Sequence, residues 1–425
     1  MIGAGGTACT TMSSIARRRF LQNGLGLSGA LLLGACGGSS SSPSPSAVAP
    51  PGPGPTPSPT PTPTPTPTPA ASECPDDFAG GQQLGVAAFV GESTRPLAQA
   101  FNSGLDGRLF TDLSKLEPTN LVTPNDSFYI RTRYPDLLVP ENPWRISVLG
   151  LPGSPVDLFL DDLLPMAVDQ GTQLMECSGN TRSASFGLLS SADWAGIRLL
   201  DAIKQFDPMG ATRLLVSGFD QYSQPSSRST PGASWIFSFD ELERTGAFLA
   251  TALNGAPLPA DHGAPVRLVV PGWYGCTCIK WVNELRFVGE DEPATSQMRE
   301  FASRTHQSGT PELARDYVPA EIDLAALPVR VEKWLVSGAI LYKVVGIQWG
   351  GAARTDQLEI RFGDGSWERI CMTQIPEAPW ALWEHAWRPA QIGNYSITLR
   401  TTDPSIRTRR LDSGYYLREV AIDQV

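Results

Sequence analysis

The sequence has few histidines, few cysteines and little positive charge, and each shortage excludes a class of protein. It contains three histidines, and no two cysteines have the Cys-x-x-Cys spacing typical of structural zinc sites. Lysine and arginine number 33 against 43 acidic residues, and the body of the chain lacks the basic clusters that bind nucleic-acid phosphates. After position 40 no apolar run approaches the roughly 20 residues that span a bilayer. We therefore expect a soluble body of about two domains.

Two targeting signals follow one another at the N-terminus. Three arginines at residues 17–19 precede an apolar run over residues 25–33, which indicates a twin-arginine signal for the export of folded proteins. Residues 33–36 then resemble a lipobox, in which the chain is cut before Cys36 and this thiol is acylated. The alternative is a plain secretory signal with an incidental cysteine. We expect a signal over residues 1–36 and a membrane-anchored lipoprotein on the periplasmic face.

A Pro/Thr/Ser-rich linker over residues 37–73 separates this signal from the body, because such a composition favours extended polyproline II over a packed core. The body holds an odd number of cysteines, so at least one thiol stays unpaired even in an oxidising compartment. Pairing of Cys74 with Cys371 is one possibility. The body cysteines are Cys74, Cys177, Cys276, Cys278 and Cys371.

The unpaired thiol with the most suggestive surroundings is Cys177. It lies in a Ser/Gly/Asn turn directly after an apolar run, and Arg182 follows five residues later. A nearby guanidinium lowers the pKa of a thiol, and the resulting thiolate is either a nucleophile or a soft metal ligand. A small buried side chain without a chemical role is the alternative.

The densest group of basic residues surrounds a predicted buried strand at residues 266–270. His262 and Arg267 lie at its start, and Lys280 follows a glycine turn at its other end. Basic side chains that converge at one end of a sheet can donate to phosphate oxygens, so this stretch predicts an anion pocket. The alternative is a buried histidine with two solvated cations.

A second pair of cations, Arg131 and Arg133, alternates along a predicted strand and therefore lies on one face. Two like charges on one face repel unless an anion lies between them or water solvates both, and the pattern leaves both explanations open.

The secondary-structure pattern favours an α+β fold followed by a β-rich region. Strand and helix signals mix irregularly up to about residue 315, and a capping box at Ser238 and Glu241 predicts a helix that ends at residues 254–255. From residue 325 onward, strands with period-2 alternation and Gly-rich turns predict an immunoglobulin-like β-sandwich. We assign a catalytic domain to residues 74–315 and the sandwich to residues 325–425.

Four stretches, in order and at similar spacing, resemble the sulfite oxidase family of molybdopterin enzymes. They are Phe-Tyr-Ile-Arg at 128–131, Glu-Cys-Ser-Gly-Asn-Thr-Arg at 176–182, Phe-Asp at 219–220, and residues 254–281 with Asp-His-Gly-x-Pro-x-Arg and Lys-Trp. The Trp-Gly-Gly-Ala-Ala-Arg segment at 349–354 is similar to part of the family's dimerisation domain. The resemblance covers roughly residues 110 to 420 and implies a molybdopterin-binding domain that precedes the β-sandwich, with homodimerisation as a possibility.

The resemblance also implies roles for individual residues. Cys177 would be the metal ligand in a molybdenum–molybdopterin cofactor. Three arginines would surround the oxyanion substrate: Arg131, Arg182 and Arg354. The residues that would bind the pterin and its phosphate are Phe128, Arg131, Arg133, Asp220, His262, Arg267, Cys278, Ile279 and Lys280.

The implied activity is oxygen-atom transfer on a small oxyanion. We predict sulfite as the substrate and a c-type cytochrome as the acceptor of the electrons. Three positions depart from the pattern of sulfite-oxidising members: Arg133 replaces a histidine, Thr181 replaces an arginine, and Pro231 replaces a tyrosine before Gly-Ala-Ser. A reductase of a sulfoxide or another oxyanion is therefore an alternative. An alternative from another class is a non-catalytic binding module displayed on a stalk.

Overall fold

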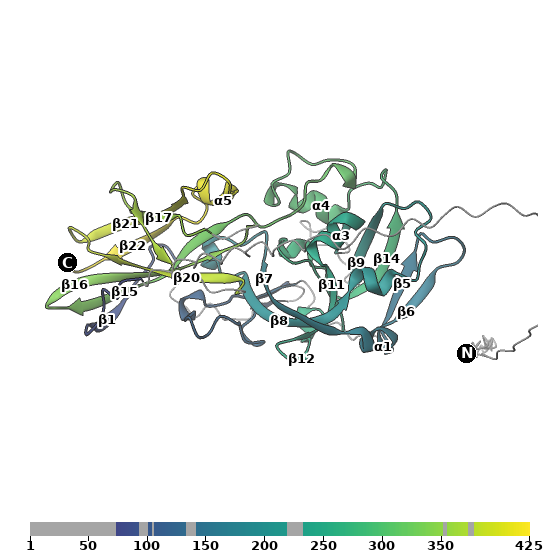
Figure 1. The fold of residues 1–425 in the computed structure, drawn as a ribbon, viewed down its shortest axis with the longest axis horizontal. Coiled ribbons are helices and arrows are strands. Elements are labelled where there is room, and N and C mark those ends of the chain that lie inside the picture. Colours follow the sequence, from purple (N-terminus) through teal and green to yellow (C-terminus); the bar gives the residue numbers. More distant parts are fainter. Residues whose placement is uncertain are drawn as a thin grey trace, which may run out of the picture. The chain divides into compact units, whose positions relative to one another are not determined.

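The computed structural model describes residues 74–92, 101–103, 106–132, 142–218, 233–351, 355–372 and 378–425. Strands dominate this part of the chain, and its helices are short (Figure 1). The export signal, the lipobox and the linker lie outside the described residues. Across the described ranges, no helix combines the length and apolar character needed to cross a membrane.

Three sheets form the part of the chain before residue 290. The first has the order β10 (Ser234–Ser238), β9 (Arg213–Gly218), β14 (Val282–Val288), β5 (Arg145–Leu149) and β6 (Val156–Phe159). The second has the order β12 (Ala256–Pro257), β11 (Phe248–Leu253), β8 (Leu189–Arg198) and β7 (Val168–Glu176), and β13 (Arg267–Val269) also pairs with β11. The third contains β2 (Phe101–Ser103), β3 (Asp106–Leu109) and β4 (Ile130–Thr132). The second sheet ends next to Cys177, and the third carries Arg131.

The strand sequences explain why these sheets form one core. In β5, Ile146 and Val148 are fully buried while their neighbours are not, which is the period-2 pattern of a strand with one face in the core. Strands β8 and β11 approach closely at Gly196, where a Cβ atom would overlap the carbonyl oxygen of Leu249. Only glycine permits this approach.

Short helices connect the strands: α1 (Leu160–Leu163), α2 (Leu199–Ile203), α3 (Phe239–Thr245), α4 (Ser296–Phe301) and α5 (Arg409–Asp412). The predicted capping box is present at the start of α3, where Ser238 and Glu241 bond reciprocally. The predicted end of this helix is wrong. Gly246 adopts φ +67° and ends α3 after Thr245, and the following apolar run forms β11 because it pairs with β8 and β13.

The C-terminal region forms two antiparallel sheets. One has the order β1 (Gln82–Ala87), β15 (Ala325–Val336), β16 (Ala339–Trp349), β20 (Trp380–Trp387) and β19 (Cys371–Met372), and Figure 1 shows β15 and β16 as a long hairpin between β1 and β20. The other has the order β18 (Glu368–Arg369), β17 (Leu358–Phe362), β21 (Gly393–Thr401) and β22 (Arg418–Ile422). Strand β1 falls within the range 74–315 that the sequence assigns to the catalytic domain, yet it is the edge strand of a C-terminal sheet.

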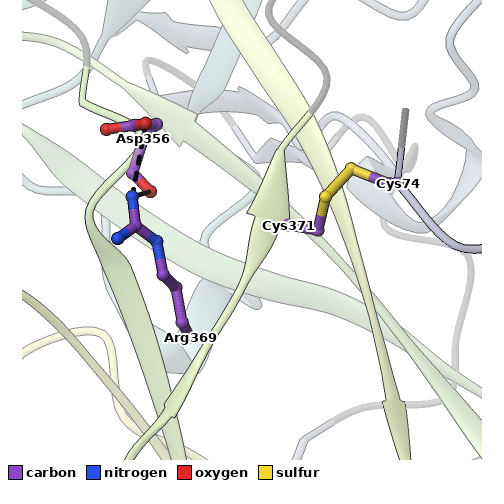
Figure 2. Close-up of a disulfide and its surroundings, with 4 residues drawn as sticks. All are labelled: Cys74, Asp356, Arg369 and Cys371. Carbon is purple, nitrogen blue, oxygen red and sulfur yellow. Dashed lines mark hydrogen bonds and ion pairs between the residues drawn. A yellow bond between two sulfur atoms is a disulfide. The ribbon is translucent and has the colours of Figure 1, made fainter. Parts of the chain in front are cut away.

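A disulfide joins Cys74 to Cys371 in β19, so the pairing that the sequence left open is formed (Figure 2). The two cysteines are 297 residues apart, and the bond fastens the chain just before β1 to the opposite edge of the same sheet. Among the described residues the free cysteines are Cys177, Cys276 and Cys278.

Candidate active site

The loop that carries Cys177 begins where β7 ends and is held by hydrogen bonds at both ends. The Cys177 amide donates to Leu188 O at 3.0 Å, and the Asn180 amide donates to Cys177 O at 2.8 Å. The Asn180 side chain accepts from the Leu188 amide at 3.0 Å. The thiol itself is free and partly accessible. The loop is therefore a closed turn that presents one thiol.

This thiol lines a cavity of about 360 Å³. The cavity brings together residues that are far apart in the sequence, because its wall combines β4, the end of β7, the loop after β13 and α4. The residues of the predicted site that lie in this wall are Phe128, Arg131, Cys177, Arg267, Cys278, Ile279 and Lys280.

Two arginines, Arg131 and Arg304, line the cavity together with the Cys177 thiol. Burial raises the pKa of the Cys177 thiol, while a backbone hydrogen bond at Gly179 and the positive charges of Arg131 and Arg304 oppose this shift. Gly179 leaves the space between the groups open, since a Cβ atom there would lie 3.3 Å from Arg304 Nη1 and 3.8 Å from Cys177 Sγ. An anion beside Cys177 would therefore face two cations.

Sequence reasoning missed Arg304. It ends the 3-10 turn η6 (Ala302–Arg304), in a stretch for which the sequence predicts no site residue. Neither periodicity nor a motif marks it. Arg304 reaches the site because α4 and η6 pack over the loop after β7, a long-range arrangement that no local pattern encodes.

The structure places Arg182 away from this cavity. Its guanidinium donates to Val90 O at 2.7 Å and lies 3.6 Å from the carboxylate of Glu92. Glu92 also pairs with Arg418, so the two arginines share a carboxylate whose side chain is 4% exposed. A buried carboxylate needs cationic partners, which gives a physical reason for this orientation of Arg182.

A second cavity of about 430 Å³ adjoins the opposite side of the loop. It shares Gly179, Thr181 and Arg304 with the first cavity, so Arg304 lies in the walls of both. Its remaining wall is polar and rich in cations: Ser178, Ser303, His306, Arg409, Arg410, Ser413 and Tyr415.

Two basic residues of the predicted anion pocket, Arg267 and Lys280, line the same cavity as the thiol. Arg267, 3% exposed, donates to His262 O at 3.0 Å and to Cys278 O at 3.1 Å. Lys280 donates to the carbonyl oxygens of Asp261 and Arg131. These bonds connect the strand, the turn before it and the loop after it into one basic wall.

Some of the hydrogen-bonding capacity of this wall is unused. His262 Nδ1 and Arg267 Nε are buried and have no hydrogen-bond partner among the described residues. Burial and the charges of Lys280 and Arg267 lower the pKa of His262 to about 3, so its ring is neutral at pH 7. Burial also lowers the pKa of Arg267. Buried polar atoms without partners are costly. An anionic oxygen would accept from Arg267 Nε. Nδ1 of the neutral His262 ring is an acceptor, because Nε2 donates to Asn125 O at 3.3 Å, and it would pair with a ligand N–H or O–H.

The remaining predicted residues divide into two groups. His262 is outside the cavity wall but packs edge-on against Phe128, with 5.3 Å between ring centroids. Arg133, Asp220 and Arg354 lie outside the described residues. Besides Arg304, the wall contains polar residues that the sequence did not suggest: Tyr129, Gln297 and Glu300.

Comparison with known proteins agrees with this geometry. Residues 133–296 match the family described as oxidoreductase molybdopterin binding domain. Mitochondrial sulfite oxidase from Macaca fascicularis is 27% identical over 316 residues, which cover 70% of this chain and 57% of that protein. The chain carries a molybdopterin-binding oxidoreductase domain and is similar to members of the sulfite oxidase family. It spans little more than half the length of this relative.

Other members of the comparison differ in chemistry. The catalytic subunit MsrP of a protein-methionine-sulfoxide reductase from Ralstonia nicotianae is 30% identical over 200 residues, covering 44% of this chain and 58% of that protein. The crystal structure of sulfane dehydrogenase SoxCD from Paracoccus pantotrophus matches in fold with a TM-score of 0.56, at 18% identity, over 76% of this chain and 88% of that chain.

The molybdopterin-binding domain implies the molybdenum–molybdopterin cofactor, and the described residues fit it. Cys177 is a free thiol in the cavity wall, and a thiolate is a suitable ligand for a soft metal. The unpartnered Arg267 Nε and the ammonium of Lys280 in the same wall suit an anionic phosphate.

Proposed function

We propose that this protein is a molybdenum-dependent oxidoreductase that transfers an oxygen atom to a small oxyanion, with sulfite as the first candidate substrate and a cytochrome as the electron acceptor. The observation that carries the proposal is a free thiol that shares one cavity with the arginines Arg131 and Arg304 and with the basic residues Arg267 and Lys280. The cofactor supplies two-electron oxygen-atom transfer when bound.

The chain's own residues have separate tasks in this proposal. Cys177 holds the metal. Arg131 and Arg304 attract and orient the oxyanion, because guanidinium groups form forked, charge-assisted hydrogen bonds with anionic oxygens. Arg267, Lys280 and the neutral His262 hold the cofactor's phosphate and pterin.

A reductase of a sulfoxide is the second candidate function, and two observations favour it. MsrP, named as a protein-methionine-sulfoxide reductase subunit, is 30% identical over the matched region, a higher value than that of the sulfite oxidase. Thr181 and Pro231 also replace residues typical of sulfite-oxidising members.

One screen of the purified holoenzyme decides between these functions. The protein is incubated with sulfite and oxidised cytochrome c, and separately with a reduced dye and a sulfoxide. Sulfite-dependent cytochrome reduction supports the first proposal, and sulfoxide-dependent dye oxidation supports the second. A molybdenum-loaded protein inactive in both assays contradicts both proposals.

We also propose that the protein is exported folded and is anchored by Cys36 to a membrane on its periplasmic side. The residues that carry the signals are given above, and the Cys74–Cys371 disulfide is consistent with an oxidising compartment. Replacement of Cys36 by serine should move the protein from the membrane fraction to the soluble periplasmic fraction. Unchanged membrane association of this variant would contradict the anchor.

For the C-terminal region, we propose an immunoglobulin-like sandwich made of the β15 sheet and the β17 sheet, which serves as a homodimer interface. The antiparallel strands and the alternating burial of β17 support the sandwich. Light scattering of the purified protein should give twice the chain mass. A mass of one chain would contradict the dimer.

A further inference from the structure

The residue just before Cys177 is a fully buried carboxylate that the C-terminal region holds. Glu176 is 0% exposed and accepts hydrogen bonds from Trp349 Nε1 at 2.9 Å and from Tyr416 Oη at 3.1 Å. Asn180, within the same loop, donates at 3.4 Å. Trp349 and Tyr416 are 173 and 240 residues away from Glu176 in the sequence, so the carboxylate is satisfied only when the C-terminal sheets are folded against this loop.

Arg410 in α5 completes this arrangement. Its Nη1 lies 3.7 Å from the Glu176 carboxylate, and its Nη2 donates to Ser178 O at 2.8 Å. The same Nη2 donates to Arg304 O at 2.8 Å. One guanidinium therefore fixes both the turn that presents the thiol and the segment that presents Arg304 to the cavity.

A third contact reaches the end of the turn. The hydroxyl of Tyr415 donates to Asn180 O, directly before Thr181 in the cavity wall. C-terminal side chains thus bond to residues on both sides of Cys177: Glu176 before it, and Ser178 and Asn180 after it. The turn has little freedom to move without breaking a buried hydrogen bond.

Burial raises the pKa of Glu176, and Arg410 and the hydrogen-bond donors oppose that rise. A buried acid is costly in any fold, and an apolar residue before Cys177 would avoid the cost. An acid at this position therefore indicates a positioning role, because hydrogen bonds restrict the direction of a side chain more strictly than apolar packing does.

We propose that Glu176, Tyr416 and Arg410 form a positioning network through which the C-terminal region sets the orientation of the Cys177 thiol and of Arg304. This inference rests on the proposed function in one respect, since it takes Cys177 as the metal ligand. The C-terminal region then has a second role besides the proposed dimer interface: it is part of the support of the active site.

The test uses two variants that each change one member of the network, Tyr416→Phe and Glu176→Gln. Tyr342→Phe is a matched control, because Tyr342 is a buried tyrosine of the same region. Its hydroxyl donates to Gln424 O at 2.8 Å and not to a residue of the Cys177 loop. It loses one tyrosine hydrogen bond as Tyr416→Phe does, so it reports the purely structural effect of such a loss.

Two readouts are measured on the full-length holoenzyme. The first is the thiolate-to-molybdenum absorption band together with kcat and KM. We expect both network variants to shift the band and to lower kcat about 10–100-fold, with a smaller change in KM and with an unchanged band in Tyr342→Phe. The second is hydrogen exchange of the backbone amides of residues 176–188, which should be faster in both network variants and unchanged in Tyr342→Phe.

The outcomes separate this inference from the proposed function. An absorption band, kcat and loop exchange equal to those of Tyr342→Phe would overturn the positioning network. A wild-type chain that holds no molybdenum would overturn the proposed function. Loop exchange would still decide whether the C-terminal region holds the turn, because that measurement does not depend on the metal.

Discussion

The basic residues and the thiol of the cavity are positioned in different ways. The basic residues come mainly from one continuous stretch, in which the turn at η4 (Ala260–His262), strand β13 and the loop up to Lys280 bond to one another. The surroundings of the thiol combine β4, the turn after β7, η6 and the C-terminal residues that hold them. The basic stretch is mainly a local construction, and the surroundings of the thiol depend on tertiary assembly. Substitutions in the two should therefore fail in different ways.

The largest effect is expected in the basic stretch. Arg267→Met removes the donor from two buried carbonyl oxygens and a cation from the cavity wall. We expect loss of the bound cofactor and a fall of about 3 kcal/mol in the free energy of unfolding. Molybdenum analysis and denaturant unfolding measure the two effects. The control is Arg286→Met, which removes an exposed arginine that pairs with Glu284 at 2.8 Å and should cost less than about 1 kcal/mol. Full molybdenum content in Arg267→Met would contradict the assignment.

A smaller effect, confined to catalysis, is expected for Arg304 in the surroundings of the thiol. Arg304→Gln should keep the cofactor and lower kcat/KM for the oxyanion about 100-fold, because one charge-assisted contact to the anion is lost. Arg182→Gln should change kcat/KM by less than about 3-fold, because the structure turns Arg182 toward Glu92. Steady-state kinetics of the two variants tests which arginine contacts the substrate: Arg304, as the geometry indicates, or Arg182, as the family resemblance implies. A larger loss of kcat/KM in Arg182→Gln than in Arg304→Gln would favour the resemblance.

The effect that is smallest at neutral pH concerns His262 and grows only as the pH falls. The pKa of His262 is lowered from 6.5 to about 3 in the folded chain, so the unfolded chain binds more protons between these values. Protonation of this histidine therefore favours the unfolded chain. The free energy of unfolding is not reduced by it above about pH 6.5, and it falls by no more than about 1.4 kcal/mol per pH unit as the pH drops toward 3. His262→Gln should make the pH dependence of the unfolding free energy shallower over this range in the cofactor-free protein. Equal slopes for the variant and the wild type would contradict a neutral buried ring.

The same contrast explains how far the sequence predicted the site. The residues from His262 to Lys280 lie close together in the chain, and their strand and turn signals were enough to predict that basic side chains converge here. The structure places Arg267 and Lys280 in one cavity wall together with Cys177. Anion binding by this wall and metal binding by Cys177 stay predictions. The resemblance added the family and the cofactor, which the comparisons confirm.

Long-range features were not predictable in this way. Arg304 and Arg410 reach the loop after β7 only through packing, and their own surroundings in the sequence have no motif. Arg182 lies five residues after Cys177, yet the buried Glu92, which is distant in sequence, determines its direction. The predicted helix up to residues 254–255 was wrong for a related reason, since pairing with β8 and β13 made its second half a strand.

The central claim is that Cys177 binds molybdenum, and spectroscopy of Cys177→Ser tests it most directly. The wild-type holoenzyme should contain about one molybdenum per chain and show a thiolate-to-metal absorption band. Cys177→Ser should lose the band and all turnover while keeping the wild-type circular dichroism spectrum. A wild-type protein without molybdenum, or a Cys177→Ser variant with an unchanged band, would contradict the account.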